Sequence, residues 1–192
     1  AFAYEYSDCW VDDARLVTLA AKDAAERGAT ILTRTKVTRA TRKDGIWEIK
    51  TTSGSYKALA LVNAAGPWVD DLESKTSPPP ESTKTIRMVK GSHIIVPKLY
   101  EGEKAYTFQG TDGRVVFAIP YQGAYTLIGT TDVPFDGDAN HVSIEKAESK
   151  YLMELVENYF QKSVSESDIK WSYSGVRPLV NDGSASVSKA TR

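Results

Sequence analysis

The spacing of apolar residues predicts one amphipathic helix near the start of the chain. Between Asp12 and Gly28, apolar positions recur at helical spacing and form a single stripe. The stripe consists of Leu16, Val17, Ala20, Ala21 and Ala24. Asp12 or Asp13 can cap the helix, and Gly28 can end it in the left-handed conformation. The stretch from Thr30 to Leu32 that follows predicts a buried strand, as in the αβ half of a layered α/β domain.

Turn residues predict that three strands follow as a meander. The strands cover residues 36–42, 45–51 and 55–63, with turn signals at Asp44-Gly45 and Ser53-Gly54. The last strand is continuously apolar over residues 58–62, which predicts burial on both of its faces. Pro67 can then start a short helix that runs to Leu72.

The proline-rich stretch from Ser74 to Thr83 is predicted to be a linker between two domains. Further strands are predicted at residues 86–96, 105–109, 115–119, 125–129 and 170–177. Ser143 can cap a second helix before the last of these strands. Its apolar face consists of Ile144, Ala147, Tyr151, Leu152, Leu155 and Tyr159. The sequence therefore predicts a mixed α+β or α/β fold. Its parts are residues 1–74, a linker at 75–84, residues 85–180 and a final loop at 181–192.

Composition and charge exclude several classes of protein. Of the 192 residues, 41% are hydrophobic and 26% are charged, which suits a folded domain rather than a disordered chain. The net charge of −1 gives no electrostatic reason to bind nucleic acid. No apolar run approaches the roughly 18 residues that a membrane-spanning helix needs. The single cysteine, Cys9, excludes an internal disulfide and is expected to be buried. With only two histidines, no dedicated metal site is expected.

Four features can carry chemistry, and each also has a purely structural interpretation. Small residues end a strand at 62–66, where a backbone can approach a ligand closely or pack tightly against a helix. His93 lies among strand formers, so it is either a core residue or a base for an alcohol proton. The segment 129–132 can form a turn whose side chains hydrogen-bond to its own backbone, or it can line a polar pocket. Arg177 follows an aromatic strand and needs an anionic partner, either Asp132 or a substrate.

Taken together, these motifs resemble the bacterial, aerobic, FAD-dependent glycerol-3-phosphate dehydrogenases of the D-amino-acid-oxidase-like group of flavoproteins. Five stretches occur in the order of that family and at about its spacing, across nearly the whole chain. They are Tyr6-Ser7-Asp8-Cys9-Trp10-Val11-Asp12-Asp13-Ala14-Arg15-Leu16, Val62-Asn63-Ala64-Ala65-Gly66-Pro67-Trp68, Lys90-Gly91-Ser92-His93, Ile128-Gly129-Thr130-Thr131-Asp132 and Tyr173-Ser174-Gly175-Val176-Arg177-Pro178-Leu179. The resemblance implies oxidation of sn-glycerol 3-phosphate to dihydroxyacetone phosphate by hydride transfer to FAD, with electrons passed to quinone.

The resemblance also implies roles for parts of the chain. Residues 1–74 become part of the FAD-binding domain, and residues 85–180 become a substrate domain, a mixed, mostly antiparallel sheet with helices on one face. The implied cofactor-binding residues are Ala64, Ala65, Gly66, Gly175 and Arg177. The implied substrate-binding residues are Arg177, Arg192, Thr130 and Thr131. His93 and Arg177 become the catalytic residues, with His93 as a candidate base. A cytoplasmic enzyme attached peripherally to the inner face of the cell membrane is implied as well, and its oligomeric state stays open.

The sequence departs from the family pattern at the cofactor site. The family opens with a strand and a Gly-rich turn that binds the FAD pyrophosphate, but no G-x-G-x-x-G occurs here. We therefore expect an internal piece of a longer protein that binds FAD poorly and is inactive alone. Two alternatives stay open. One is a flavoenzyme for an amine or another 2-hydroxy acid. The other is a non-catalytic binding module, in which Arg177 is internally paired and His93 is sealed from solvent.

Overall fold

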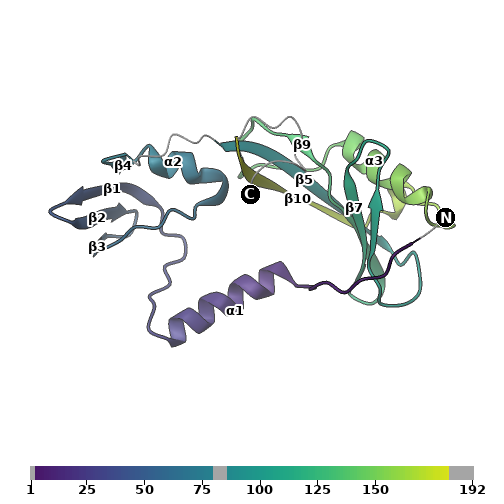
Figure 1. Cartoon of the computed structure of the whole chain (residues 1–192), viewed down its shortest axis with the longest axis horizontal. Coiled ribbons are helices and arrows are strands. Elements are labelled where there is room, and N and C mark those ends of the chain that lie inside the picture. Colours follow the sequence, from purple (N-terminus) through teal and green to yellow (C-terminus); the bar gives the residue numbers. More distant parts are fainter. Residues whose placement is uncertain (1–2, 80–85, 182–192) are drawn as a thin grey trace.

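The computed structural model describes residues 3–79 and 86–181, which form two sheets and several helices (Figure 1). The first sheet has the strand order β3-β2-β1-β4 and consists of β1 (Val37–Lys43), β2 (Ile46–Thr51), β3 (Ser55–Ala58) and β4 (Thr76–Ser77). The second has the order β10-β5-β8-β7-β6, with β9 paired to β5. Its strands are β5 (Ile86–Pro97), β6 (Tyr106–Gln109), β7 (Val115–Tyr121), β8 (Tyr125–Gly129), β9 (Val133–Pro134) and β10 (Trp171–Val180). The helices are α1 (Asp13–Glu26), α2 (Val69–Glu73) and α3 (Lys146–Glu157), with 3-10 turns η1 (Gly66–Trp68) and η2 (Glu166–Asp168).

Turn chemistry explains the meander of the first sheet. Asp44 and Gly45 both have positive φ angles, 51° and 81°, which is the geometry of a two-residue hairpin turn between β1 and β2. Only β4 departs from an antiparallel arrangement, because it pairs in parallel with β1. It lies inside the stretch predicted to be a linker, and the division into domains stays a prediction. The first sheet ends at Ser77 and the second begins at Ile86.

The core lies between α3 and one face of the six-stranded sheet. Alternate positions of the strands point toward α3, as the two-residue period of a strand requires. The fully buried members of this cluster are Ile94, Val96, Val116, Ala118, Ile128, Leu152 and Val156. The predicted mixed α/β fold is confirmed, and the six-stranded sheet carries α3 on a single face.

Removing one core side chain from α3 is expected to destabilise the second sheet. Leu152 is fully buried among the strands, so Leu152→Ala removes apolar burial and leaves a cavity. The expected loss in the free energy of unfolding is about 2–5 kcal/mol. Glu154→Ala on the exposed side of the same helix should change it by less than about 0.5 kcal/mol. Chemical denaturation of the full-length protein followed by tryptophan fluorescence measures both, and equal effects would contradict this placement of the core.

One predicted strand is absent, and another is shorter than predicted. Residues 30–32 form no strand, and the side chains of Ile31 and Leu32 are 46% and 45% exposed. The third strand of the meander ends at Ala58 rather than Asn63, and Leu59 and Val62 beyond it are exposed. A strand needs a neighbour for its backbone hydrogen bonds, and within residues 3–79 and 86–181 neither segment has one.

The helices also differ from the prediction in detail. Asp12 caps α1 as predicted, since its side chain accepts a hydrogen bond from the Arg15 amide, but α1 buries none of its residues. The second helix begins at Lys146 and is capped by Glu145, not by Ser143, because Glu145 and Glu148 form a reciprocal capping box. The prediction that Cys9 is buried is wrong, because Cys9 is exposed.

Candidate functional site

The central strand β5 divides its side chains between the two faces of the sheet. Ile94 belongs to the core under α3, and Ser92 donates a hydrogen bond to Glu148 of α3. His93 and Gly91 therefore lie on the opposite face, which we call the open face. Large side chains on it, among them Tyr173, are partly exposed. Chemistry on the open face is supported by polar groups that reach it from β5, β8 and β10.

His93 is held between the two strands that flank β5. Its ring stacks on Tyr173 of β10, with ring centroids 4.8 Å apart and planes 9° apart. On the other side it lies over Gly129 of β8, where any Cβ atom would overlap the ring. The Nδ1 atom is buried and has no hydrogen-bond partner among the described residues. The structure thus fixes the plane of the imidazole and leaves a buried nitrogen unpaired.

The electrostatic surroundings of His93 favour its neutral form. Burial lowers the pKa of the imidazole below its ordinary value of 6.5, and the positive charge of Arg177 lowers this pKa further. The carboxylate of Asp13 acts in the opposite direction and is outweighed. At neutral pH the ring is therefore a free base that can accept a proton.

Two glycines leave a bare floor of backbone beside His93. Gly91 and Gly175 face each other across the β5–β10 pair, two residues along their strands from His93 and Tyr173 and on the same face. We call this pair of glycines the glycine floor. A Cβ at Gly91 would lie 2.5 Å from the hydroxyl of Thr130 and 2.9 Å from Nη2 of Arg177, so the glycine makes room for both groups. A Cβ at Gly175 would meet nothing within 4 Å, so the space above this residue is open. A flat ligand can therefore contact the sheet directly at this point.

Arg177 borders the other end of this floor. Its Nη2 atom donates to the Thr131 carbonyl at 2.9 Å and pairs with the Asp132 carboxylate. The sequence left open whether Asp132 or a substrate pairs with Arg177, and the structure shows Asp132 in this role. The guanidinium is not sealed, because its side chain stays 34% exposed. Its buried Nε has no partner among the described residues. A positive group with spare donors thus faces the glycine floor.

The two predicted threonines occupy different positions. Thr130 lies next to Gly91 on the open face, and its hydroxyl donates to the Thr131 carbonyl at 3.1 Å. Thr131 is buried, and its hydroxyl donates to Glu148 at 2.6 Å and accepts from the Ser92 amide at 2.9 Å. Thr130 can therefore line a pocket, while the hydroxyl of Thr131 is already committed inside the protein.

The predicted adenosine cradle lies in the loop before η1. Asn63 holds this loop, because its side chain accepts from the Ala65 amide and donates to the Val69 carbonyl. Gly66 has a φ of 56°, a left-handed conformation that favours glycine. The following turn η1 packs against β10, which brings the loop to the same strand as Gly175. Ala64 is exposed beside it.

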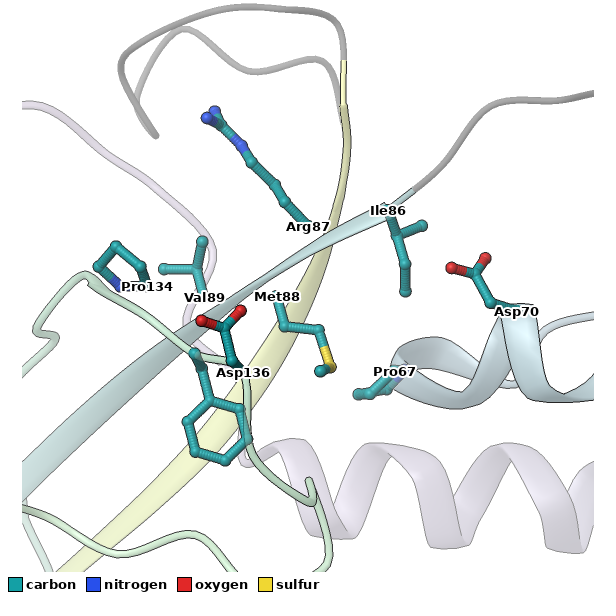
Figure 2. Close-up of a pocket in the computed structure, with 9 residues that line it drawn as sticks. Pro67, Asp70, Ile86, Arg87, Met88, Val89, Pro134 and Asp136 are labelled. Atoms are coloured by element: carbon teal, nitrogen blue, oxygen red, sulfur yellow. The ribbon is translucent and has the colours of Figure 1, made fainter.

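A cavity of about 520 Å³ lies between η1, α2 and the start of β5. Figure 2 shows Pro67 and Asp70 facing Ile86 and Met88 across it. The remaining lining residues are Arg87, Val89, Pro134, Phe135 and Asp136. The cavity contains none of the predicted site residues, so it does not alter the assignment of the open face. Arg192, predicted to bind substrate, lies outside the described residues.

Sequence reasoning missed the polar residues on the α3 side of the sheet. Lys90 and Glu148 are 3% and 5% exposed, and their side chains form an ion pair of 2.9 Å. A signal was present, because Glu148 interrupts the apolar face predicted for the second helix. A charged residue at such a position is rarely buried unless it has partners. Tyr173, which stacks on His93, was also missed as a neighbour of the site.

Comparison with known proteins identifies the family. A sequence profile of the family described as FAD dependent oxidoreductase, or DAO, matches residues 1–192. The chain belongs to this family. Its sequence is 47% identical over 195 residues to D-erythritol 1-phosphate dehydrogenase of Brucella abortus, covering 98% of this chain and 39% of that protein. It is 49% identical over 199 residues to glycerol-3-phosphate dehydrogenase of Pseudomonas aeruginosa, covering 98% of this chain and 38% of that protein. The predicted resemblance to glycerol-3-phosphate dehydrogenases is confirmed.

The fold of this DAO family member agrees with a solved structure. The glycerol-3-phosphate dehydrogenase of Bacillus halodurans, complexed with FAD, matches 90% of this chain and 36% of its own chain, with a TM-score of 0.76 and 32% sequence identity. FAD, the cofactor expected from the sequence, is the cofactor of the family. The chain spans about two fifths of the length of the curated relatives that it matches.

Two further findings concern the part of this DAO chain that the structure describes. Within residues 3–79 and 86–181, no helix is both long and apolar enough to cross a membrane. In the same residues, no three His, Cys, Asp or Glu side chains gather into a group that could hold a metal ion.

Proposed function

We propose that the chain forms the substrate-facing part of a FAD-dependent dehydrogenase that oxidises sn-glycerol 3-phosphate to dihydroxyacetone phosphate. The observation that carries this proposal is the placement of His93 and Arg177 on the open face, on either side of the floor formed by Gly91 and Gly175. A neutral base and a fixed positive group beside an open surface are what the oxidation of an anionic alcohol requires.

The residues of the floor fit the flat ring of FAD. Gly175 has open space where a side chain would stand, and Gly66 lies in the loop that reaches β10 through η1. In the proposal, Gly175 and Arg177 contact the reactive end of FAD. Ala64, Ala65 and Gly66 hold its adenosine half. When bound, FAD accepts the hydride that leaves carbon 2 of the alcohol.

His93 takes the proton that the substrate hydroxyl loses as the carbonyl forms. Its lowered pKa keeps the imidazole unprotonated at neutral pH, so it is ready to act as a base. Stacking on Tyr173 and contact with Gly129 hold the ring in one plane, which reduces the cost of aligning it with the substrate. The hydride and the proton together account for the two hydrogens removed from the alcohol.

Arg177 orients the substrate through its positive charge and its N–H groups. Asp132 and the Thr131 carbonyl fix one side of the guanidinium, so the spare donors keep one direction. Thr130 lines the pocket beside Gly91, and Thr131 supports it from behind. The proposal keeps Arg192 as a second substrate-binding arginine. For the whole protein it includes quinone as electron acceptor and attachment to the inner face of the cell membrane.

The non-catalytic alternative agrees with only part of this geometry. It predicts an internally paired Arg177 and a sealed His93, and Arg177 is indeed paired with Asp132. However, the Arg177 side chain remains one-third exposed and the space above Gly175 is open. The similarity to enzymes named for glycerol 3-phosphate and D-erythritol 1-phosphate favours a phosphorylated polyol over an amine.

Anaerobic reduction of the full-length flavoprotein tests the proposed function. Bleaching of the flavin absorbance is followed after mixing with glycerol 3-phosphate, D-erythritol 1-phosphate, sarcosine or a D-amino acid. We expect the fastest reduction with glycerol 3-phosphate and none with the amines. Faster reduction by D-erythritol 1-phosphate would replace the substrate within the same class. Reduction by an amine alone would overturn the proposal.

A substitution at Gly175 tests whether the glycine floor is the reaction site. Gly175→Val places a branched side chain in the open space above the floor, where no described atom opposes it. We expect kcat/KM to fall about 10- to 100-fold with the melting temperature unchanged. Thr107→Val is the matched control, because Thr107 is exposed on β6, three strands from His93 on the same face. Equal activity of the two variants would rule out the floor as the reaction site.

A further inference from the structure

The carboxylate of Glu148, on the α3 side of the six-stranded sheet, has all of its acceptor positions filled. Glu148 of α3 accepts from Thr131 at 2.6 Å and from Ser92 at 2.8 Å through Oε1. Through Oε2 it accepts from the Glu145 amide and binds the Lys90 ammonium, both at 2.9 Å. An ionised carboxylate offers about four lone pairs, and four donors occupy them here. Burial raises the pKa of Glu148, but these hydrogen bonds outweigh it and hold the pKa below its ordinary value.

The groups bound by Glu148 are neighbours in sequence of groups on the open face. Ser92 precedes His93, and its hydroxyl also bonds to that of Ser174 at 2.8 Å, the residue before Gly175. Thr131 turns its hydroxyl toward Glu148 and its carbonyl toward Nη2 of Arg177. The buried carboxylate of Glu148 therefore contacts two segments of the proposed site directly, at Ser92 and Thr131, and a third, at Ser174, through the Ser92 hydroxyl.

Stability alone is a poor explanation for this cluster. Lys90 and Glu148 lie almost wholly out of water, and removing two charges from water costs much of what their attraction returns. Apolar residues of similar volume often serve as well or better at such positions. A fully satisfied buried network does, however, fix the geometry of the groups that it joins.

We propose that Glu148 is a positioning residue, which directs the guanidinium of Arg177 toward the substrate by holding the Thr131–Asp132 segment from behind the sheet. This inference rests on the proposed function for its kinetic consequence. Its structural consequence is independent of the substrate. When Glu148 loses its charge, Thr131 loses a charged acceptor. The hydrogen bonds between Thr131 and the Ser92 backbone remain, so the segment whose carbonyl receives Arg177 is held less firmly.

The test uses the full-length enzyme with Glu148→Gln, Arg177→Lys and the double variant. An amide replaces one acceptor oxygen of Glu148 by a donor, which cannot satisfy Lys90 and Thr131 together. We expect Glu148→Gln to lower kcat/KM for glycerol 3-phosphate about 10- to 100-fold. In the Arg177→Lys background the same change should cost less than about threefold, since the two act as one unit. Additive losses, or no loss, would overturn the proposal.

A crystal structure of the Glu148→Gln enzyme supplies a readout that does not depend on turnover. Arg177 is expected to leave the Thr131 carbonyl, and an unchanged Arg177 would overturn the proposal whatever the kinetics. Ser149→Ala is the matched control on the same helix, because the Ser149 hydroxyl bonds only to the Lys146 carbonyl among the contacts described. If the wild-type enzyme oxidises no phosphorylated polyol, the proposed function is contradicted. The crystal structure would still decide the role of Glu148.

Thr131 provides a second pair of variants if Glu148→Gln does not fold. Thr131→Val keeps the shape of the side chain and removes the hydroxyl that reaches Glu148, whereas Thr131→Ser keeps the hydroxyl. The valine variant should show the same non-additive loss with Arg177→Lys, and the serine variant should retain most of the activity. Equal activity of the two variants would overturn the inference.

Discussion

Arg177→Lys is expected to lower kcat/KM of the full-length enzyme for glycerol 3-phosphate by about 10²- to 10³-fold, close to the cost of removing one donor to a developing charge. Lysine keeps the positive charge but loses the planar fork of the guanidinium. A lysine ammonium that bonds to the Thr131 carbonyl and Asp132 keeps one N–H group, without the fixed planar direction of the remaining guanidinium donors. Steady-state kinetics with a soluble electron acceptor measure the loss.

A second arginine provides the control for this substitution. Arg114 also forms an ion pair with an aspartate, with its Nη2 2.6 Å from Asp112, and it stacks on Tyr151 of α3 away from the open face. Arg114→Lys should therefore leave kcat/KM within about threefold of wild type. If Arg177→Lys is equally mild, the guanidinium does not contact the substrate, and the proposed site loses its anion-binding group.

The strands around the site could be predicted because local signals and the fold agree. Runs of strand-forming residues ended by turns placed β5 at residues 86–96, and the structure extends it by one residue, to Pro97. The apolar stripe of α3 likewise faces the core at Leu152 and Leu155. At these positions the amphipathic pattern and the packing demand the same arrangement.

Two apolar segments could not be placed from sequence, because burial depends on a neighbour that the pattern does not specify. Residues 30–32 and 59–63 are as apolar as a buried strand, yet no described strand lies beside them. The side chains of Ile31, Leu32 and Leu59 stay exposed, and Val62 is 82% exposed. Hydrophobic pattern reports what a segment can bury, whereas pairing decides whether it does so.

The site was predicted as separate motifs, and the register of two strands brings them together. His93 pairs with Tyr173, and Gly91 pairs with Gly175, because β10 runs antiparallel to residues 86–95 of β5. Turn residues and alternation do not fix this register when residues 98–170 separate the two strands. Glu148 contacts Thr131, 17 residues away, and Ser92, 56 residues away, and these contacts depend on packing that the sequence pattern does not specify.

His93→Asn is expected to lower kcat by about 10²- to 10⁴-fold, the usual contribution of a positioned base. Asparagine is polar and similar in length, but it cannot take the hydroxyl proton. In the wild type, log kcat/KM should fall with decreasing pH through the pKa of His93, which burial and Arg177 place below 6.5. The variant should lose this acidic limb, and a pH profile of flavin reduction measures both effects.

The same pKa shift predicts a change in stability that needs no substrate. Because the folded-state pKa is lowered, the unfolded chain binds more protons as the pH falls from about 6.5 through the folded-state pKa. The free energy of unfolding should therefore decrease across that window in the wild type, and this part of the decrease should vanish in His93→Asn. His141→Asn is the control, since His141 is the other histidine of the chain and lies exposed beside Asp138. If His93→Asn keeps the acidic limb of kcat/KM, or His141→Asn removes it, His93 is not the base.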